Sequence, residues 1–404
     1  MSARLLQRLL LIAGCASAGS VTAQGPLDEL GPRLAFGSAP GPWAQLSVTS
    51  EVTVYGFDEP PPGLVFTGEE PFVAPRIGLT ADAGVGERTR LHALVRADRG
   101  FDPGREQDGD VRFDELFVQI DLFDRLRGRL EVGRFATAFG GWVGRHQAWD
   151  NPLVTAPALY DDMVPITPEA APADPAAFAA RRDNPENKDT WVPVVWGPVY
   201  ATGAAFAAGA GAFDLTLEVK NTALSAAPER WDDGFDTDPT FTGRLTWHPR
   251  PDWLVGVSLS DGPYLDESAE PTLPPGTDVD DYAQTTWGID LTYERHHLQL
   301  WAELAGSRFE VPGVGDAELL GGFLELRYKP APRLWLAGRI NHTRFDDVHG
   351  LERPWDRHLS RLDLAVGYRH SAHLQAKLEY SVGEQAGRDS NGDYRLAGQL
   401  VLWF

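Results

Sequence analysis

Apolar and polar residues alternate along most of the chain beyond residue 42. In the stretch 43–57, for example, Leu46, Val48, Val52 and Val54 share one face of an extended chain, and most of the residues between them are polar. Alternation sustained over about ten residues predicts β-strands with one apolar and one polar face. The pattern predicts sixteen strands, near residues 43–56, 72–83, 88–98, 111–122, 128–137, 193–207, 212–221, 240–248, 253–261, 284–294, 297–308, 317–328, 334–344, 357–369, 373–382 and 393–404.

The connections between these strands alternate in length. Short connections fall at 84–87, 123–127, 208–211, 249–252, 295–296, 329–333 and 370–372. Long ones fall at 57–71, 99–110, 138–192, 222–239, 262–283, 309–316, 345–356 and 383–392. A soluble β-sandwich has no reason to sort its loops in this way, whereas an outer-membrane barrel has tight periplasmic turns and longer extracellular loops. We therefore expect an all-β fold, a sixteen-stranded antiparallel transmembrane β-barrel.

Composition narrows the class of protein further. The 404 residues include 36 Lys and Arg against 58 Asp and Glu, which gives a formal net charge of −22 and excludes a basic nucleic-acid binder. The 13 Trp, 19 Phe and 10 Tyr argue against a disordered acidic chain. The one cysteine excludes a disulfide framework and a cysteine-based zinc cluster.

The N-terminus has the pattern of an export signal. Arg4 and Arg8 precede an apolar run at 9–19, and small residues around Ala23 suit signal peptidase. The competing interpretation is a lipoprotein signal ending before Cys15. We expect a signal peptide at 1–23, a periplasmic N-terminal segment at 24–42 and the barrel at 43–404.

Aromatic residues and the C-terminal strand agree with a membrane barrel. Aromatic side chains at strand ends beside the short turns suit an interfacial girdle, although aromatics of a soluble core would give the same pattern. They are Trp247, Trp253, Tyr293, Tyr328 and Tyr368. The final strand ends at Phe404 with alternate apolar positions, which resembles the signal read by the barrel-assembly machinery.

The segment 131–140, Glu-Val-Gly-Arg-Phe-Ala-Thr-Ala-Phe-Gly, resembles a stretch around the fifth strand of the phosphate-selective porin O and P family. Here Ala138 replaces the usual proline. The resemblance covers about 50 residues. It implies a homotrimer of sixteen-stranded barrels in which the third loop folds inward. Phosphate selectivity is not carried over, because the family uses a ladder of Arg and a ring of Lys, and this chain has only Lys188, Lys220, Lys329 and Lys377.

If the apolar faces meet lipid, the opposite faces line a water-filled channel. Charges of both signs on facing walls would set up a transverse field that favours polar solutes; the alternative is that they only pair across strands. The residues that we expect to line the pore are Arg76, Arg90, Arg96, Glu115, Arg129, Glu131, Arg244, Glu303, Arg327, Arg339, Arg361 and Asp363.

The connection 138–192 is the candidate constriction loop. Long loops are usually functional or disordered, and the aromatic residues of this one argue against disorder. An alanine-rich run at 172–182 predicts a short helix. A surface lid is the alternative to a constriction. The loop residues that we expect to approach the channel are Arg145, His146, Asp150, Asp161 and Asp162.

No nucleophile elbow, metalloprotease, phosphate-loop or dinucleotide motif occurs in the sequence. We expect no catalytic residues, no structural metal site and no cofactor, with calcium bound by the acidic loops as an open possibility. The expected function is passive diffusion of small hydrophilic solutes or ions across the outer membrane of a Gram-negative cell. The expected partners are those solutes, outer-membrane lipid and the assembly machinery. The alternatives are a scaffold barrel that houses a partner protein and lacks an inward loop, and a barrel enzyme.

Overall fold

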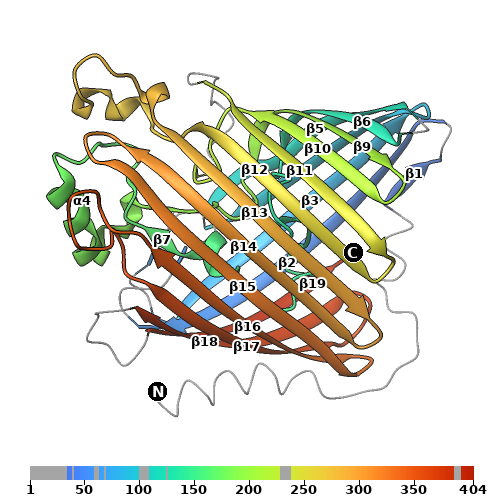
Figure 1. Ribbon diagram of the computed structural model, residues 1–404. Coiled ribbons are helices and arrows are strands. Elements are labelled where there is room, and N and C mark those ends of the chain that lie inside the picture. Colours follow the sequence, from blue (N-terminus) through green and yellow to red (C-terminus); the bar gives the residue numbers. More distant parts are fainter. Residues whose placement is uncertain are drawn as a thin grey trace, which may run out of the picture.

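The computed structural model describes residues 34–38, 41–58, 63–67, 70–99, 109–123, 126–227, 238–385 and 393–404. Sixteen of its strands close into one antiparallel barrel (Figure 1). They are β2 (Trp43–Phe57), β3 (Phe72–Val85), β4 (Thr89–Asp98), β5 (Asp110–Phe123), β6 (Gly128–Phe135), β9 (Ala201–Ala210), β10 (Phe213–Lys220), β11 (Thr240–Arg250), β12 (Trp253–Pro263), β13 (Ala283–Arg295), β14 (Leu298–Val311), β15 (Gly315–Ala331), β16 (Leu334–Phe345), β17 (Leu359–Arg369), β18 (Leu374–Gln385) and β19 (Asp393–Trp403).

Each strand pairs with its neighbours in sequence, and the ring closes between the last strand and the first. In that closing pair, Trp403 lies opposite Thr49 and Arg395 lies opposite Phe57. Closure leaves no unpaired sheet edge, so every barrel strand is hydrogen-bonded to a neighbouring strand on both sides. The predicted fold class is confirmed. A short additional strand, β1 (Ala35–Gly37), pairs with β2 and was not expected from the sequence.

Two predicted connections differ from the structure. The strand expected at 193–207 begins only at Ala201, because Pro193, Gly197 and Pro198 interrupt the ladder and Val199 adopts a positive φ of 48°. The loop expected at 309–316 is a tight turn, since β14 runs on to Val311 and β15 starts at Gly315. The other short connections join strands at one end of the barrel, the short-turn end, and the longer ones lie at the opposite long-loop end.

The outer wall is apolar. Large side chains that alternation predicted to face lipid are substantially exposed, among them Leu304, Leu324, Ile340 and Leu364. Near the short turns Trp247, Tyr328 and Tyr368 are also exposed, and the rings of Trp253 and Tyr293 lie 4.6 Å apart across two strands. A belt of exposed leucine and isoleucine with aromatic residues at its rim is the surface of a barrel that spans a bilayer.

The connection between β6 and β9, residues 136–200, folds into the barrel. It contains α3 (Ala158–Asp161), α4 (Pro175–Ala180), the short pair β7 (Met163–Val164) and β8 (Val192–Pro193), and the 3-10 turns η1 (Val143–Arg145), η2 (Arg181–Asp183) and η3 (Pro185–Thr190). The helix predicted within 172–182 is α4, where Asp174 caps the first turn by accepting a hydrogen bond from Ala177 N at 2.7 Å.

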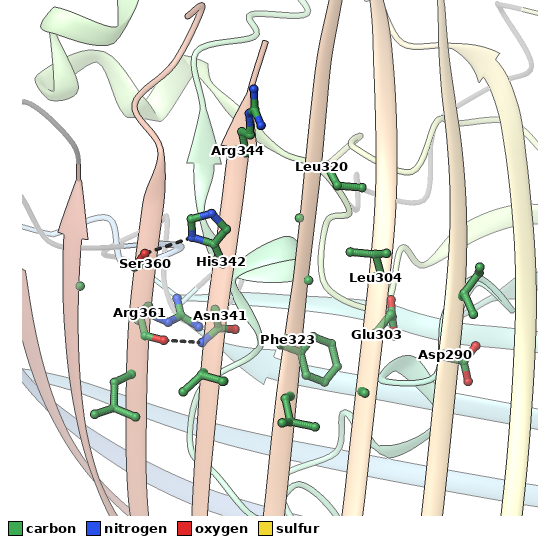
Figure 2. Close-up of a pocket in the computed structure, with 18 of the residues that line it drawn as sticks. Asp290, Glu303, Leu304, Leu320, Phe323, Asn341, His342, Arg344, Ser360 and Arg361 are labelled. Carbon is green, nitrogen blue, oxygen red and sulfur yellow. Dashed lines mark hydrogen bonds between the residues drawn. The ribbon is translucent and has the colours of Figure 1, made fainter.

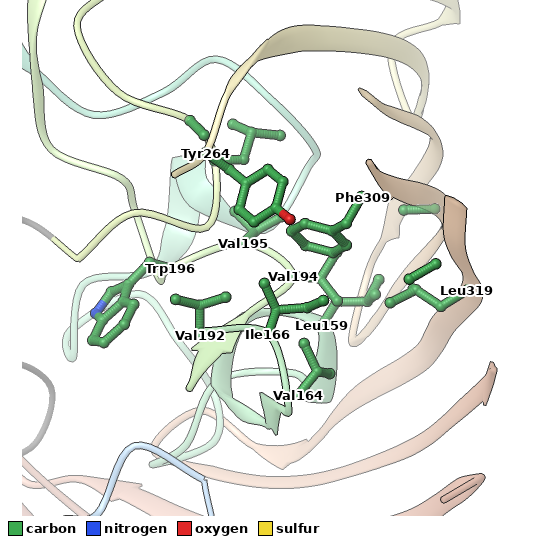
Figure 3. Close-up of a cluster of buried hydrophobic side chains, with 14 of the residues drawn as sticks. Leu159, Val164, Ile166, Val192, Val194, Val195, Trp196, Tyr264, Phe309 and Leu319 are labelled. Carbon is green, nitrogen blue, oxygen red and sulfur yellow. The ribbon is translucent and has the colours of Figure 1, made fainter. Parts of the chain in front are cut away.

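A hydrophobic cluster fixes this loop against the inner wall at the long-loop end. Figure 3 shows Val194, Val195 and Ile166 of the loop beside Phe309 of β14 and Leu319 of β15. Tyr264 packs edge-on against Phe309, with ring centroids 5.2 Å apart. Burial of each large apolar side chain contributes about 1.5–3 kcal/mol, so the loop has its own core and is not a loose flap. In the described part of the chain, no helix is long and apolar enough to cross a membrane.

Candidate functional site

The loop enters the lumen directly after β6, at the end of the Glu131–Gly140 segment. Wall side chains accept hydrogen bonds from two backbone groups of the loop: Glu218 from Ala138 N at 2.8 Å and Glu303 from Gly141 N at 2.9 Å. Gly140 has a φ of 73°, and a Cβ there would lie 2.1 Å from the Tyr160 hydroxyl. Only glycine fits this turn, because both the backbone conformation and the space exclude a side chain.

Arg339 of β16 is the central anchor of the loop. It donates to the carbonyl oxygens of Thr155 at 3.1 Å and Ala156 at 2.8 Å, and its side chain is fully buried. Asp363 at 2.8 Å and Glu325 at 3.2 Å neutralise its charge. The same guanidinium therefore joins two wall carboxylates to the loop backbone, and its desolvation is compensated by charge-assisted hydrogen bonds.

A second group of anchors surrounds α3. Asp161 accepts hydrogen bonds from Arg395 at 2.9 Å and Arg361 at 3.1 Å. Burial alone would raise the pKa of Asp161, but these two guanidiniums outweigh it and hold the pKa below its usual value. Burial raises the pKa of the adjacent Asp162 to about 6. Arg361 offsets this only in part, since its contact with Asp162 is longer, at 3.4 Å, and the charge of Asp161 adds to the increase. Burial and the neighbouring Glu303 carboxylate, to which its hydroxyl donates, raise the pKa of Tyr160 well above its usual value.

The deepest part of the loop, residues 145–155, reaches toward the short-turn end. Glu379 accepts from the backbone nitrogens of Val154 and Thr155, and Lys377 donates to Ala148 O at 2.8 Å and Leu153 O at 2.9 Å. The ring of Trp149 lies 5.7 Å from that of Trp403 on the last strand.

The structure places the five predicted loop residues in different settings. Arg145 contacts Glu325 at 2.6 Å and lies over the Trp301 ring, and His146 contacts the Tyr200 hydroxyl at 2.7 Å. Asp161 and Asp162 contact wall arginines, as above, whereas Asp150 is exposed to solvent in the lumen.

Some of the predicted pore-lining residues are covered by the loop or paired within the wall, and do not face open space. Glu303, Arg339, Arg361 and Asp363 point into the barrel, but they lie beneath the loop and are bonded to it or to one another, because the loop covers this wall. Arg244 pairs across strands within the wall, as in the alternative given above, because it contacts Asp290 at 2.7 Å.

The open side of the lumen is a cavity of about 620 Å³ between the loop and the wall formed by β19 and β2 to β5. Its walls include Arg76, which contacts Glu51 at 3.1 Å and Asp98 at 3.0 Å, and His92. The two ring nitrogens of His92 lie 2.8 Å from Asp82 and 3.0 Å from Glu115. About half of its lining residues have charged or polar side chains, so water and polar solutes are suitable contents.

Of the remaining predicted residues, Arg96 borders this cavity and the others lie outside its lining. Arg96 is buried and contacts Asp114 at 2.8 Å. Toward the short-turn end, Arg90 lies 3.8 Å from Asp121 and Arg129 lies 3.4 Å from Glu131, and both arginines are well exposed. Arg327 lies over the Trp301 ring and donates to the amide oxygen of Gln299.

A second inward segment was missed by sequence reasoning. Residues 63–67 of the connection between β2 and β3 cover the cavity at the long-loop end, where Val65 is buried and Leu64 N donates to Asp161 at 3.1 Å. Lys188 donates to Gly63 O at 2.9 Å and Val65 O at 2.6 Å, and burial lowers its pKa to about 7. The apolar run Leu64-Val65-Phe66 within a polar loop was the available signal.

Another hollow, of about 1200 Å³, is not part of the lumen. Figure 2 shows Leu304 and Leu320, which border it on neighbouring strands, and the outward-facing His342 and Ser360, joined by a 3.0 Å hydrogen bond. Its exposed leucines and isoleucines belong to the outer wall. Among the described residues, no three His, Cys, Asp or Glu side chains are grouped to hold a metal ion.

Comparison with known proteins finds the fold but no sequence relative. No family model and no curated protein matches the chain. OmpF of Salmonella typhi, solved with daunomycin, superposes with a TM-score of 0.57 at 9% identity, covering 92% of this chain and 100% of OmpF. The channel DcaP of Acinetobacter baumannii gives 0.56 at 12%, covering 91% and 99%. An anion-selective porin from Comamonas acidovorans gives 0.56 at 10%, covering 90% and 100%. These likenesses show a barrel of the outer-membrane porin type.

Proposed function

We propose that this protein is an outer-membrane channel for passive diffusion of small hydrophilic solutes. The short-turn end then faces the periplasm and the long-loop end faces the exterior, as in other bacterial barrels. The observation that carries the proposal is the cavity of about 620 Å³, with charged side chains in its walls, that the folded-in loop leaves along β19 and β2 to β5. Solutes are selected by size and by the charges of Arg76, His92, Glu115 and Asp150, without energy coupling.

The inward loop weighs against the scaffold alternative. A barrel that houses a partner protein needs an empty interior, whereas here residues 136–200 pack against the inner wall through their own hydrophobic cluster. No arrangement of described residues specifically favours the enzyme alternative.

Several finer expectations belong to the same proposal. The chain assembles as a homotrimer in outer-membrane lipid, reaches the membrane through its N-terminal signal and is inserted by the assembly machinery through its last strand. The resemblance of residues 131–140 to the phosphate-selective porin O and P family is a further prediction, and phosphate specificity is not proposed. The predicted signal peptide lies outside the described residues.

A swelling assay of proteoliposomes tests the function directly. Vesicles that contain the refolded barrel are diluted into isotonic solutions of neutral sugars of increasing size. We expect rapid swelling with the smallest sugars and a sharp size limit, because the loop occupies part of the lumen. Swelling no faster than that of protein-free vesicles with every solute, for a barrel shown to be folded by its heat-dependent gel mobility, would reject the proposed function.

A further inference from the structure

The two ends of the barrel carry opposite charge. The net charge of −22 is concentrated in the long loops. In the connection between β12 and β13, residues 264–282, there are six acidic residues and no basic one. All six are exposed: Asp266, Glu267, Glu270, Asp278, Asp280 and Asp281.

The short-turn end is basic where it is formed by the turns and strand ends of β13 to β18. Its turns and strand ends contain five cationic residues against one acidic residue, Glu294. The five cationic residues are Arg295, Arg327, Lys329, Arg333 and Arg369. Although the chain has an excess of carboxylates, these residues form an arc of positive charge at the short-turn mouth of the barrel.

The positive charges on the inner side of this arc are not neutralised by ion pairs. In the described part of the chain, Arg327 donates to Gln299 and Arg369 to Gln375 at 3.4 Å, so both hydrogen bond to neutral amides. By contrast, Arg127 on the opposite arc contacts Asp214 at 2.8 Å. Strand alternation directs Lys329 inward as well, two residues beyond Arg327.

Arg369 connects this arc to the cavity. The Arg369 guanidinium is 4.7 Å from the centroid of the Trp149 ring, and Trp149 lines the lower part of the cavity with Trp403. The charge of Arg327 is attracted by Glu294 and Glu325 and repelled by Arg369 and Arg145, so the arc keeps an excess of positive charge. An ion that leaves the cavity toward the short turns therefore meets a fixed positive field, after passing acidic loops at the other mouth.

From this separation of charge we propose that the channel rectifies, conducting more current when the long-loop side is positive. The inference rests on the proposed function and adds a direction to it. With that polarity, cations concentrated at the acidic mouth and anions concentrated at the basic mouth are both driven into the lumen, which fills with carriers. With the reverse polarity both are driven out, and the lumen is depleted.

Screening sets how the effect depends on salt. The Debye length is about 10 Å at 0.1 M salt and about 3 Å at 1 M, so fixed charges control the ion content of the lumen only in dilute salt. We expect the ratio of currents at equal and opposite voltages to be about two or more at 0.1 M KCl and to approach one at 1 M.

Single channels in a planar bilayer test this. The test variant is R327Q/K329Q/R369Q, and the matched control is R295Q, at the same rim but on the outward-facing side of β13. A thiol introduced at the exposed Ser371, modified by an impermeant reagent from one side only, gives the orientation of each inserted channel. We expect the triple variant to lose most of the asymmetry and the control to keep it.

The outcomes separate the inference from the function. A conducting wild-type channel with symmetric current at 0.1 M KCl, with the opposite polarity, or with a ratio unchanged in the triple variant would overturn the inference and leave the proposed function standing. A folded barrel with no conductance would overturn the proposed function itself. If the triple variant does not fold, the comparison of 0.1 M with 1 M KCl on the wild type decides the matter.

Discussion

The walls on the two sides of the lumen have the same alternating sequence pattern but different surroundings. On β15 to β18 the inward charges Arg339, Arg361 and Asp363 are buried under the loop, whereas on β4 and β6 the inward Arg90 and Arg129 are exposed to solvent. Alternation thus specifies which residues point inward. Whether an inward residue meets water or the loop is decided by a segment more than a hundred residues away in sequence.

This difference predicts two classes of variant. Changes on the loop-covered wall should alter stability and the size of the channel together, because each side chain there compensates buried groups of the loop. Changes on the open wall should alter ion preference with little effect on stability, since water can solvate whatever is left behind.

The largest effect is expected for Arg339→Met. The side chain of Arg339 is 0% exposed, and its removal leaves Asp363 and Glu325 buried without their partner. Loss of one member of a buried ion pair costs about 3–5 kcal/mol, so the thermal unfolding midpoint should fall and the loop should detach, which raises conductance. The matched variant Arg129→Met, at a side chain 50% exposed, should change the stability by less than about 0.5 kcal/mol. Equal midpoints for the two variants would contradict the distinction between the walls.

A smaller effect is expected for Glu379→Gln. The carboxylate accepts hydrogen bonds from Val154 N, Thr155 N and the Thr155 hydroxyl, and an amide offers a donor where an acceptor is required. We expect a loss of about 1–3 kcal/mol and faster proteolytic cleavage within residues 142–161. Glu131→Gln, on the other side of the lumen, serves as control. Cleavage at the wild-type rate would show that this anchor does not hold the loop.

Ion preference should respond to Arg129→Gln. This arginine is exposed and only loosely paired with Glu131, at 3.4 Å, so its charge acts on passing ions. The reversal potential in a KCl gradient should move toward cation preference, more at low salt than at high salt, with no change in the unfolding midpoint. An unmoved reversal potential at every salt concentration would place Arg129 off the ion path.

The smallest effect is expected for Asp162→Asn. Burial raises the pKa of Asp162 to about 6, so the folded protein binds a proton that the unfolded chain has already released. Stability from this residue is therefore greatest in acid and falls as the pH rises from about 4 to about 6. The asparagine variant should be more stable than the wild type by about 1 kcal/mol at pH 7.5 and no more stable at pH 4. A difference independent of pH would exclude the carboxyl group as its cause.

Sequence patterns predicted the barrel more completely than the lumen. Side-chain alternation is local and survives in each strand, so Trp43–Phe57 or Leu359–Arg369 could be identified without tertiary information. Strand β9 was misplaced because the apolar run 192–200 is equally typical of a strand and of a loop core. The pairing of Asp161 with Arg361 and Arg395 joins residues about two hundred positions apart, and no local pattern encodes it.

Single-channel recording of the refolded protein in a planar bilayer tests most directly the claim that water crosses the barrel beside the loop. We expect discrete conductance steps for the wild type and larger steps for Arg339→Met, in which the loop is released. A barrel that is folded by its gel mobility but remains electrically silent in both forms would contradict it.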